Sequence, residues 1–445
     1  MKNKIPIKQY RRIMKQCVMS IVLAFLASVV LSMPAHGTDK KNAPHGKLAA
    51  KYEKQHKELT DKPTITGYDK LIQWCKLNKM SVEADALRQE KALLEYPGRK
   101  AKVKTKDVKA LGDLAKWCEK NGLEEQAEES WNAVIDCDPD NAEARIGLGF
   151  AKLDGQWISS LEISKRYVAL EPDQRKDFFN TIKKAGFKGT NADLDVYVSW
   201  VKAPTGLLKD QRVPDREEKD AWYIASVPAN YDTFGEPLPL VIVLHGGDAN
   251  DGDANMMLGF TSSASAAFKN CIVILPNHIR GRWSWIGAFE MTYLLDTIGD
   301  VMHRWRVDQR RIYLTGYSMG GNGVWGFGTQ CHELFAAMAP MAGFWITKFN
   351  FPMATLIPKP VCILHGTKDP TVPVQGARDA LALLKSLGAS NVELRECTES
   401  GHVVPEAEME KVREWLLQFR NKEKFDIDKL RKRVATVKFG WGNID

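Results

Sequence analysis

The stretch that decides the fold runs from Arg311 to Gly321 and reads RIYLTGYSMGG. Its first five residues, Arg311–Thr315, form an apolar run typical of a buried strand, and the residues after Ser318 are typical of a helix. A serine between two glycines at such a turn sits in a strained backbone, with its hydroxyl above the sheet and the next amides facing it. A plain glycine turn would need neither flanking element. The stretch therefore predicts Ser318 as a nucleophile.

Two later residues have the positions that partners of Ser318 require. A serine hydroxyl needs a general base, and a third group must hold that base in the right tautomer. In this type of sheet the carboxylate follows a late strand and the histidine follows the last one. Asp369 lies just after the apolar run Val361–Leu364, and His402 follows a predicted strand that ends near Arg395. We therefore predict Asp369 as the acid and His402 as the base.

The alternatives to these two residues are weaker. His365 precedes a glycine at a strand end and is interpreted as a turn residue, and Glu399 lies on the wrong loop to replace Asp369. The other candidate histidines lie before the elbow or beside the helix that follows it: His278, His303 and His332.

Donors for a tetrahedral oxyanion are predicted at two places. One is the backbone N–H of Met319, directly after the nucleophile. The other belongs to the loop after the apolar run Leu240–Leu244, where glycine lets the backbone approach a substrate. Gly247 is our choice for the second N–H, with Gly246 as the near alternative. His245 is expected to brace this loop.

Aromatic residues near the predicted site suggest a pocket. Trp283, Trp285 and Phe344 lie on loops that follow strands, the side on which parallel sheets place their ligands. They are candidates to line a pocket for an acyl or sugar group. Packing in the core or at the rim is the alternative role.

Strand and helix signals alternate from residue 194 to 420. This alternation predicts a mainly parallel, eight-stranded α/β sheet covered on both faces. The expected strands are Val196–Val198, Trp222–Val227, Leu240–Leu244, Cys271–Leu275, Arg311–Thr315, Phe335–Met341, Val361–Leu364 and Val392–Arg395. The expected helices are Ala288–Arg304 and residues 319–331, 376–387 and 405–419.

The segment 194–420 resembles an α/β-hydrolase catalytic domain. The resemblance is carried by VPANYD at 227–232, LHGG at 244–247, GYSMGG at 316–321, and His365-Gly366 with Asp369. More narrowly, it is similar to polyhydroxybutyrate-depolymerase-like and feruloyl-esterase-like proteins, and to dienelactone-hydrolase and prolyl-oligopeptidase-type domains. The resemblance implies a serine carboxylesterase that acts through an acyl-enzyme on Ser318 and needs no metal or cofactor. Carbohydrate-linked acetyl or feruloyl esters are the implied substrates.

Two other functions remain open from the sequence. A peptidase of the prolyl-oligopeptidase type shares this fold, but such enzymes carry a propeller where this chain has a helical region. A non-catalytic interaction protein, with the hydrolase domain as a scaffold, is the second alternative. The intact set of three residues argues against it.

The segment 46–190 is predicted to be helical and to repeat itself at an offset of 43 residues. Tyr68, Leu71, Ile72 and Cys75 match Leu111, Leu114, Ala115 and Cys118 at the spacing of one helical face. The stop Asp138-Pro139-Asp140-Asn141 resembles the tetratricopeptide family, although that family repeats every 34 residues. A surface for a protein partner is one interpretation. A packed helical appendage is the other, and it is favoured.

The net charge of +8 is concentrated in residues 1–37, which contain six basic residues and no acidic one. The near-neutral remainder gives no footprint for nucleic acid. A basic stretch, the apolar run Val18–Leu31 and the small residues around Ala35–Gly37 predict a signal peptide and hence a secreted or periplasmic protein. An uncleaved, membrane-anchored leader is the alternative. The basic tail at 421–445 receives no predicted role.

Overall fold

The computed structural model of the chain describes residues 48, 51–52, 54–56, 58–60, 62–247, 253–279, 285–343, 351–421 and 425–437. These residues divide into two compact units, which meet in the chain between Val198 and Ser199. The predicted leader and the end of the tail lie outside the described residues. Among the helices of the described ranges, none is both long and apolar enough to cross a membrane.

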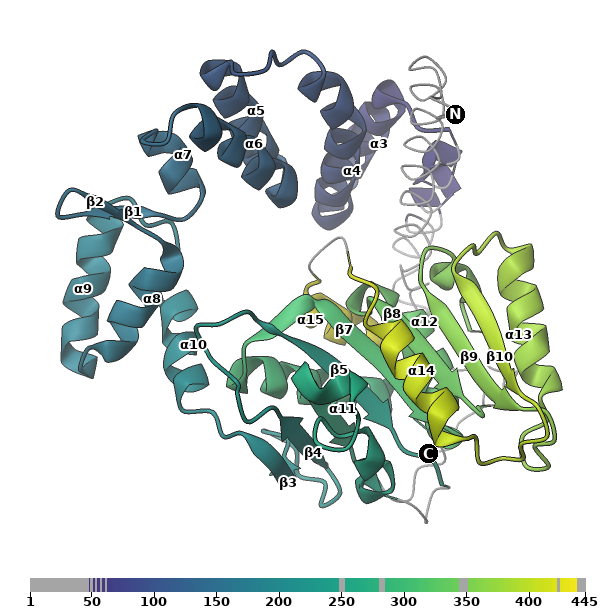
Figure 1. Ribbon diagram of the computed structural model, residues 1–445. Helices are drawn as coiled ribbons and strands as arrows, with labels where there is room; N and C mark the ends of the chain where they lie inside the picture. Colours follow the sequence, from purple (N-terminus) through teal and green to yellow (C-terminus); the bar gives the residue numbers. More distant parts are fainter. Residues whose placement is uncertain are drawn as a thin grey trace, which may run out of the picture. The chain divides into compact units, whose positions relative to one another are not determined.

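The N-terminal unit is built from short helices and one small hairpin (Figure 1). The described residues between 51 and 60 are helical. The helices that follow are α3 (Ile65–Leu77), α4 (Ser81–Lys100), α5 (Val108–Lys120), α6 (Glu124–Cys137), α7 (Ala142–Gly147), α8 (Ser160–Ala169), α9 (Pro172–Lys184) and α10 (Asn191–Val201), which enters the second unit. The hairpin joins β1 (Ala151–Leu153) to β2 (Gln156–Ile158).

Helices α3 and α5 end in the same way. The side-chain amide of Asn78 donates to the carbonyl of Trp74 at 2.8 Å, and that of Asn121 donates to the carbonyl of Trp117 at 2.7 Å. Both helices also begin with a side-chain cap, Thr64 in α3 and Asp107 in α5. The residues matched at an offset of 43 therefore occupy equivalent places in two similar helices.

The cysteines of both units are free thiols. Cys75 and Cys118 are fully buried in α3 and α5, and burial raises the pKa of each thiol to about 11. The other cysteines of the described ranges are also unpaired: Cys137, Cys271, Cys331, Cys362 and Cys397. At neutral pH the buried thiols therefore stay protonated and act as small apolar groups.

Two local predictions for this part of the chain were wrong or incomplete. Val196–Val198 was predicted as a strand but lies inside α10. The start of α10 explains the difference, because Thr190 and Asp193 exchange side-chain to backbone hydrogen bonds that fix a helix N-terminus. The hairpin β1–β2 was not predicted, although Asp154 and Gly155 both adopt the positive φ that such a tight turn needs.

The C-terminal unit contains the predicted eight-stranded, mainly parallel sheet (Figure 1). Its strands are β3 (Gly206–Arg212), β4 (Trp222–Val227), β5 (Leu238–Leu244), β6 (Ile272–Pro276), β7 (Val307–Tyr317), β8 (Ala337–Met341), β9 (Val361–Gly366) and β10 (Val392–Cys397). The order across the sheet is β10-β9-β8-β7-β5-β6-β4-β3, with β3 and β4 antiparallel to their neighbours. The α/β-hydrolase fold predicted from the sequence is confirmed.

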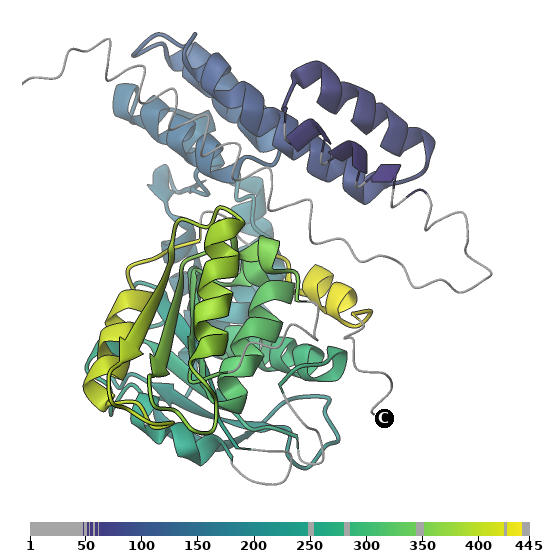
Figure 2. The ribbon, with the colours of Figure 1, turned by 90° about the vertical axis from the view of Figure 1, so that its right-hand side faces the viewer.

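Helices cover both faces of this sheet, as Figure 2 shows. They are α11 (Ala288–Arg304), α12 (Met319–Gln330), α13 (Gln375–Ser386), α14 (Glu406–Leu416) and α15 (Ile427–Val434), with the 3₁₀ turns η1 (Ala254–Phe260) and η2 (Ala267–Asn270). Alternate residues of each central strand point to opposite faces. In β5, Leu240 and Ile242 pack with α11 and α12, whereas Val241 and Val243 pack with η1 and α14. Apolar side chains buried on both faces therefore hold the sheet in place, and the predicted site lies at the carboxyl ends of its strands.

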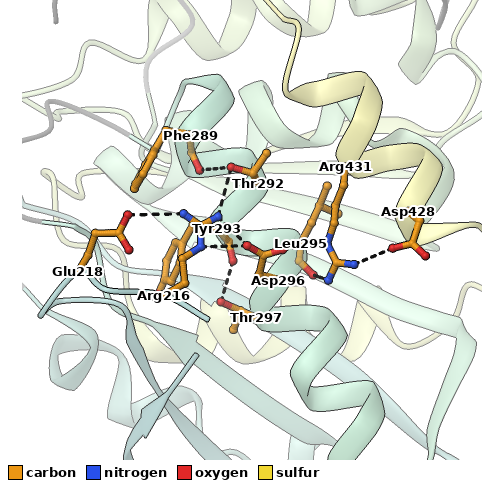
Figure 3. Close-up of polar contacts among 10 residues, drawn as sticks. All are labelled: Arg216, Glu218, Phe289, Thr292, Tyr293, Leu295, Asp296, Thr297, Asp428 and Arg431. Atoms are coloured by element: carbon orange, nitrogen blue, oxygen red, sulfur yellow. Dashed lines mark hydrogen bonds and ion pairs between the residues drawn. The ribbon is translucent and has the colours of Figure 1, made fainter. Parts of the chain in front are cut away.

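The first part of the tail folds onto this unit through α15. Leu430 of α15 is buried in the core beside α11. Arg216, from the turn after β3, and Arg431 both donate to the carboxylate of Asp296 on α11, at 2.6 Å and 2.8 Å (Figure 3). Arg431 also pairs with Asp428. One carboxylate thus ties the start of the sheet and the C-terminal helix to the same helix.

Candidate active site

The strand-to-helix turn holds Ser318 in a strained backbone. Its φ of 55° and ψ of −115° lie in a backbone region that residues other than glycine rarely adopt. Its N–H donates to the carbonyl of Met341 at 2.9 Å. The turn is so tight that a Cβ on Gly320 would lie 2.0 Å from the carbonyl oxygen of Leu244. Only glycine fits there, which explains the second glycine of the motif.

The three residues predicted as nucleophile, acid and base meet at the carboxyl ends of β7, β9 and β10. The Oγ of Ser318 lies 3.0 Å from Nε2 of His402, and Nδ1 of His402 lies 2.7 Å from Oδ2 of Asp369. An ionised carboxylate only accepts hydrogen bonds, so the proton of the neutral imidazole is on Nδ1. Nε2 therefore presents its lone pair to the serine hydroxyl, as a general base must.

The carboxylate of Asp369 is buried and held at both oxygens. Its Oδ1 accepts the N–H groups of Thr371 and Val372, each at 2.8 Å, and its Oδ2 faces His402. Burial alone would raise the pKa of Asp369, but the hydrogen bonds from Val372, His402 and Thr371 outweigh it and hold the pKa below its usual range. Asp369 is therefore ionised at neutral pH.

His365 and Glu399, two of the alternatives from the sequence, have other roles. His365 was interpreted as a turn residue but lies in β9, where it is completely buried, and its Nε2–H donates to the carbonyl of Val372 at 2.7 Å. It thereby braces the loop that carries Asp369. The carboxylate of Glu399 is largely exposed and pairs with Lys368.

Tyr317 contributes a contact that the sequence did not reveal. Its hydroxyl donates to the backbone carbonyl of His402, and its ring lies 5.2 Å from the imidazole ring. Burial, together with the charge of Asp369, raises the pKa of Tyr317 to about 12, so the donor stays protonated. Because Tyr317 occupies a variable position of the G-x-S-x-G motif, nothing in the motif itself assigns it this contact.

His245 fixes the loop that follows β5. Its Nε2 accepts the N–H of His278 at 3.0 Å, so its proton is on Nδ1, which donates to the carbonyl of Gly246 at 2.6 Å. Burial lowers the pKa of His245 to about 4, so the ring is neutral at pH 7. The brace expected from the sequence is thus a histidine of one defined tautomer.

This brace orients one of the two predicted oxyanion donors, the N–H of Gly247. The peptide bond is planar and trans, so an anchored Gly246 carbonyl makes the N–H of Gly247 point the opposite way. The loop lies against the nucleophile, because a Cβ on Gly246 would be 3.1 Å from Cβ of Ser318. Met319 begins α12, and the first N–H groups of a helix have no acceptor within it. Gly247 and Met319 can therefore offer amides on the side of Ser318.

The aromatic pocket residues are only partly placed. Trp285 is completely buried, and its indole N–H donates to the carbonyl of His245 at 3.0 Å. Its ring packs edge-on against the rings of His245 and His278. Trp285 therefore has the packing role that the sequence left open. Trp283 and Phe344 lie outside the described residues.

Comparison with known proteins points to esterases. The sequence profile of the phospholipase/carboxylesterase family matches residues 288–419. A probable feruloyl esterase C from Aspergillus terreus is 29% identical over 182 residues, which cover 39% of this chain and 63% of that protein. A bifunctional acetylxylan esterase/xylanase from Neocallimastix patriciarum is 28% identical over 31% of this chain and 20% of that protein. The chain thus spans less than two thirds of the length of these two relatives.

Among solved structures, a thermostable esterase matches with 22% identity and a TM-score of 0.39. The match covers 50% of this chain and 64% of that one.

Proposed function

We propose that the C-terminal unit is a serine carboxylic ester hydrolase with Ser318 as nucleophile, His402 as general base and Asp369 as the group that orients it. The observation that carries the proposal is the continuous contact from the Ser318 hydroxyl through both nitrogens of His402 to a buried carboxylate. The match of residues 288–419 to a carboxylesterase family and the two esterase relatives support the same reaction class.

The first half of the proposed reaction forms an acyl-enzyme. Nε2 of His402 takes the proton of Ser318 as its Oγ attacks the ester carbonyl. The amides of Met319 and Gly247 hold the negative charge that develops on the carbonyl oxygen. His402, now protonated and stabilised by Asp369, gives the proton to the leaving alcohol.

The second half releases the acid. Water takes the place of the alcohol, and His402 removes a proton from it as it attacks the acyl carbonyl. A negative charge develops again on the carbonyl oxygen, and the amides of Met319 and Gly247 stabilise it again. Collapse of this intermediate frees the carboxylic acid and restores the hydroxyl of Ser318. The strained Ser318 backbone keeps its Oγ within reach of His402 through both halves.

The proposed substrates are acetyl or feruloyl esters attached to carbohydrate. This choice rests on the relatives, one a probable feruloyl esterase and one a bifunctional acetylxylan esterase/xylanase. The leader predicted at 1–37 would direct export to the compartment where extracellular polymers are found. We also propose that α3–α4 and α5–α6 are two copies of one helical repeat, supported by their equivalent Asn78 and Asn121 ends.

The test is hydrolysis of p-nitrophenyl esters of graded acyl length, of methyl ferulate and of acetylated xylan, with peptide p-nitroanilides as the peptidase arm. We expect ester hydrolysis that falls about 10⁵–10⁶-fold in Ser318→Ala. Cleavage of peptides in place of esters would replace the proposed substrate class. Ester hydrolysis that Ser318→Ala leaves unchanged would contradict the assigned nucleophile.

A further inference from the structure

A groove of about 530 Å³ lies between α4 and α5 of the N-terminal unit. It is lined by Ile65, Leu94, Glu95, Gly98, Arg99, Lys102, Val103, Ala110, Asp113, Leu114 and Trp117. Most of these side chains are apolar. Arg99 stacks over the Trp117 ring at 4.3 Å and pairs with Glu95 at 3.0 Å, so the charge of Arg99 is already matched. The floor of the groove therefore suits an apolar side chain.

Arg99 and Lys102 of the groove lining belong to a dense run of basic residues in the sequence. Residues 99–109 read RKAKVKTKDVK and form the end of α4, the connecting turn and the start of α5. Lys100 pairs with Glu129, and the carboxylate of Asp107 caps α5. The remaining lysines of the run are exposed and have no ion pair within the described ranges: Lys102, Lys104, Lys106 and Lys109. Asp113 is the acidic residue of the lining that does not belong to the Arg99 pair.

Gly98 keeps the groove open where α4 approaches its end. Its backbone is helical, and a glycine inside a helix is about 0.5–1 kcal/mol less favourable than alanine. A Cβ at this position would meet no atom within 4 Å. Neither the backbone nor close packing therefore requires glycine here. The missing side chain leaves space at the wall of the groove.

We propose that this groove binds an acidic peptide segment of a partner protein. One apolar side chain of the peptide enters the groove beside Gly98 and Leu114. The carboxylates of the peptide's acidic residues face Lys102, Lys104 and Lys106. Single exposed ion pairs contribute only about 0–1 kcal/mol, so the lysines alone would not hold a specific ligand. The apolar lining of the groove adds a site that a peptide side chain can occupy and that the phosphate backbone of a nucleic acid cannot. The proposal concerns the helical unit alone and is independent of ester hydrolysis.

The test selects ligands for the full chain from a random twelve-residue peptide library displayed on phage. Enriched peptides are then synthesised with a fluorophore, and their affinity is measured by fluorescence anisotropy. We expect acidic sequences that share an apolar residue. Affinity should fall at least tenfold in the triple variant Lys102→Glu, Lys104→Glu and Lys106→Glu. The matched control reverses three exposed lysines of the same unit that do not line the groove, Lys70, Lys176 and Lys184, and should bind normally.

Gly98→Leu separates the groove from simple charge attraction. Leucine favours a helix more than glycine does and enters open space, so this variant should fold. It should weaken peptide binding at least tenfold, whereas Gly98→Ala should change it less. No enrichment over the starting library, or enrichment of peptides without acidic residues, would overturn the proposal. Binding that Gly98→Leu leaves intact and heparin displaces would instead show a nonspecific polyanion surface.

Discussion

The polar side chains near Ser318 and the lysines beside the groove of the helical unit differ in how many partners hold them. Near Ser318, Asp369 is held by Thr371, Val372 and His402, and His245 is held by Gly246 and His278. In the groove of the helical unit, the exposed Lys102 has no ion pair within the described ranges. Groups that are held keep one geometry, which is what catalysis needs. Groups that are not held can adapt to a partner, which is what docking needs.

After removal of the nucleophile itself, the largest expected effect comes from replacing the acid, Asp369. In Asp369→Asn the side-chain oxygen can still accept from Thr371 and Val372, but the amide no longer forces the proton of His402 onto Nδ1. We expect kcat to fall about 10⁴-fold with little change in fold. Ester hydrolysis and circular dichroism measure the two quantities. A loss below tenfold would show that Asp369 does not set the tautomer.

Acid should destabilise the C-terminal unit, because this unit contains buried histidines that are neutral in the folded state. Burial lowers the pKa of His245 and of His332 to about 4, against about 6.5 in an unfolded chain. Between pH 6.5 and pH 4 these imidazoles bind protons in the unfolded state but stay neutral in the folded state. The stabilisation is thus complete above pH 6.5 and is lost as the pH falls towards 4, by up to about 3 kcal/mol for each ring.

Urea unfolding followed by tryptophan fluorescence between pH 7 and pH 4 measures this loss. The variant His332→Gln serves as the control, because it should show a shallower decline than the parent. A free energy of unfolding that stays constant from pH 7 to pH 4.5 would contradict the buried, neutral state of these rings.

Loosening the oxyanion loop should give an intermediate effect. His245→Ala removes the donor to the Gly246 carbonyl and frees the Gly247 amide, so we expect kcat to fall about 10–100-fold with KM nearly unchanged. His245→Asn places an amide N–H near the former Nδ1 and should retain more activity. Steady-state kinetics on a short acyl ester compares the two. Equal losses in both variants would mean that the hydrogen bond is not what matters.

Tyr317→Phe should have a smaller effect on catalysis. It removes one neutral hydrogen bond to the His402 carbonyl and keeps the ring contact. Such a bond contributes about 0.5–1.5 kcal/mol, so kcat should fall about 2–10-fold while KM stays the same. A change confined to KM would indicate that Tyr317 acts on substrate binding instead.

The smallest expected effect is on the helical side of the comparison. No catalytic residue proposed here belongs to the N-terminal unit, so reversing Lys102, Lys104 and Lys106 should leave kcat/KM for a neutral short-chain ester within twofold. The reversal of Lys70, Lys176 and Lys184 is the matched control. A tenfold change in the first set alone would mean that the helical unit contributes to the reaction.

The sequence predicted the elements that topology dictates. A strand, a glycine-bounded serine and a helix in succession locate Ser318, and the order of the later strands then leaves few positions for its partners. The structure brings Ser318, Asp369 and His402 together at these positions. Long apolar strands were also predictable, because burial on both faces leaves a continuous apolar run.

Residues whose roles depend on packing could not be predicted in the same way. Trp285 looked like a pocket residue but is buried under the loop of His245. The edge strand β3 escaped prediction because only three of its seven residues are partly buried and the others are exposed. Val196–Val198 was misjudged because β-branched residues favour strands, whereas the hydrogen bonds between Thr190 and Asp193 impose a helix. Such contacts are set by neighbours that a local pattern does not contain.

The most direct test of the central claim is labelling with a fluorophosphonate followed by peptide mass spectrometry. This reagent reacts with an activated serine, so we expect one adduct, on Ser318. Labelling should vanish in Ser318→Ala and slow about 10³-fold or more in His402→Ala. A folded chain that remains unlabelled, or that carries the adduct on another residue, would contradict the proposed site.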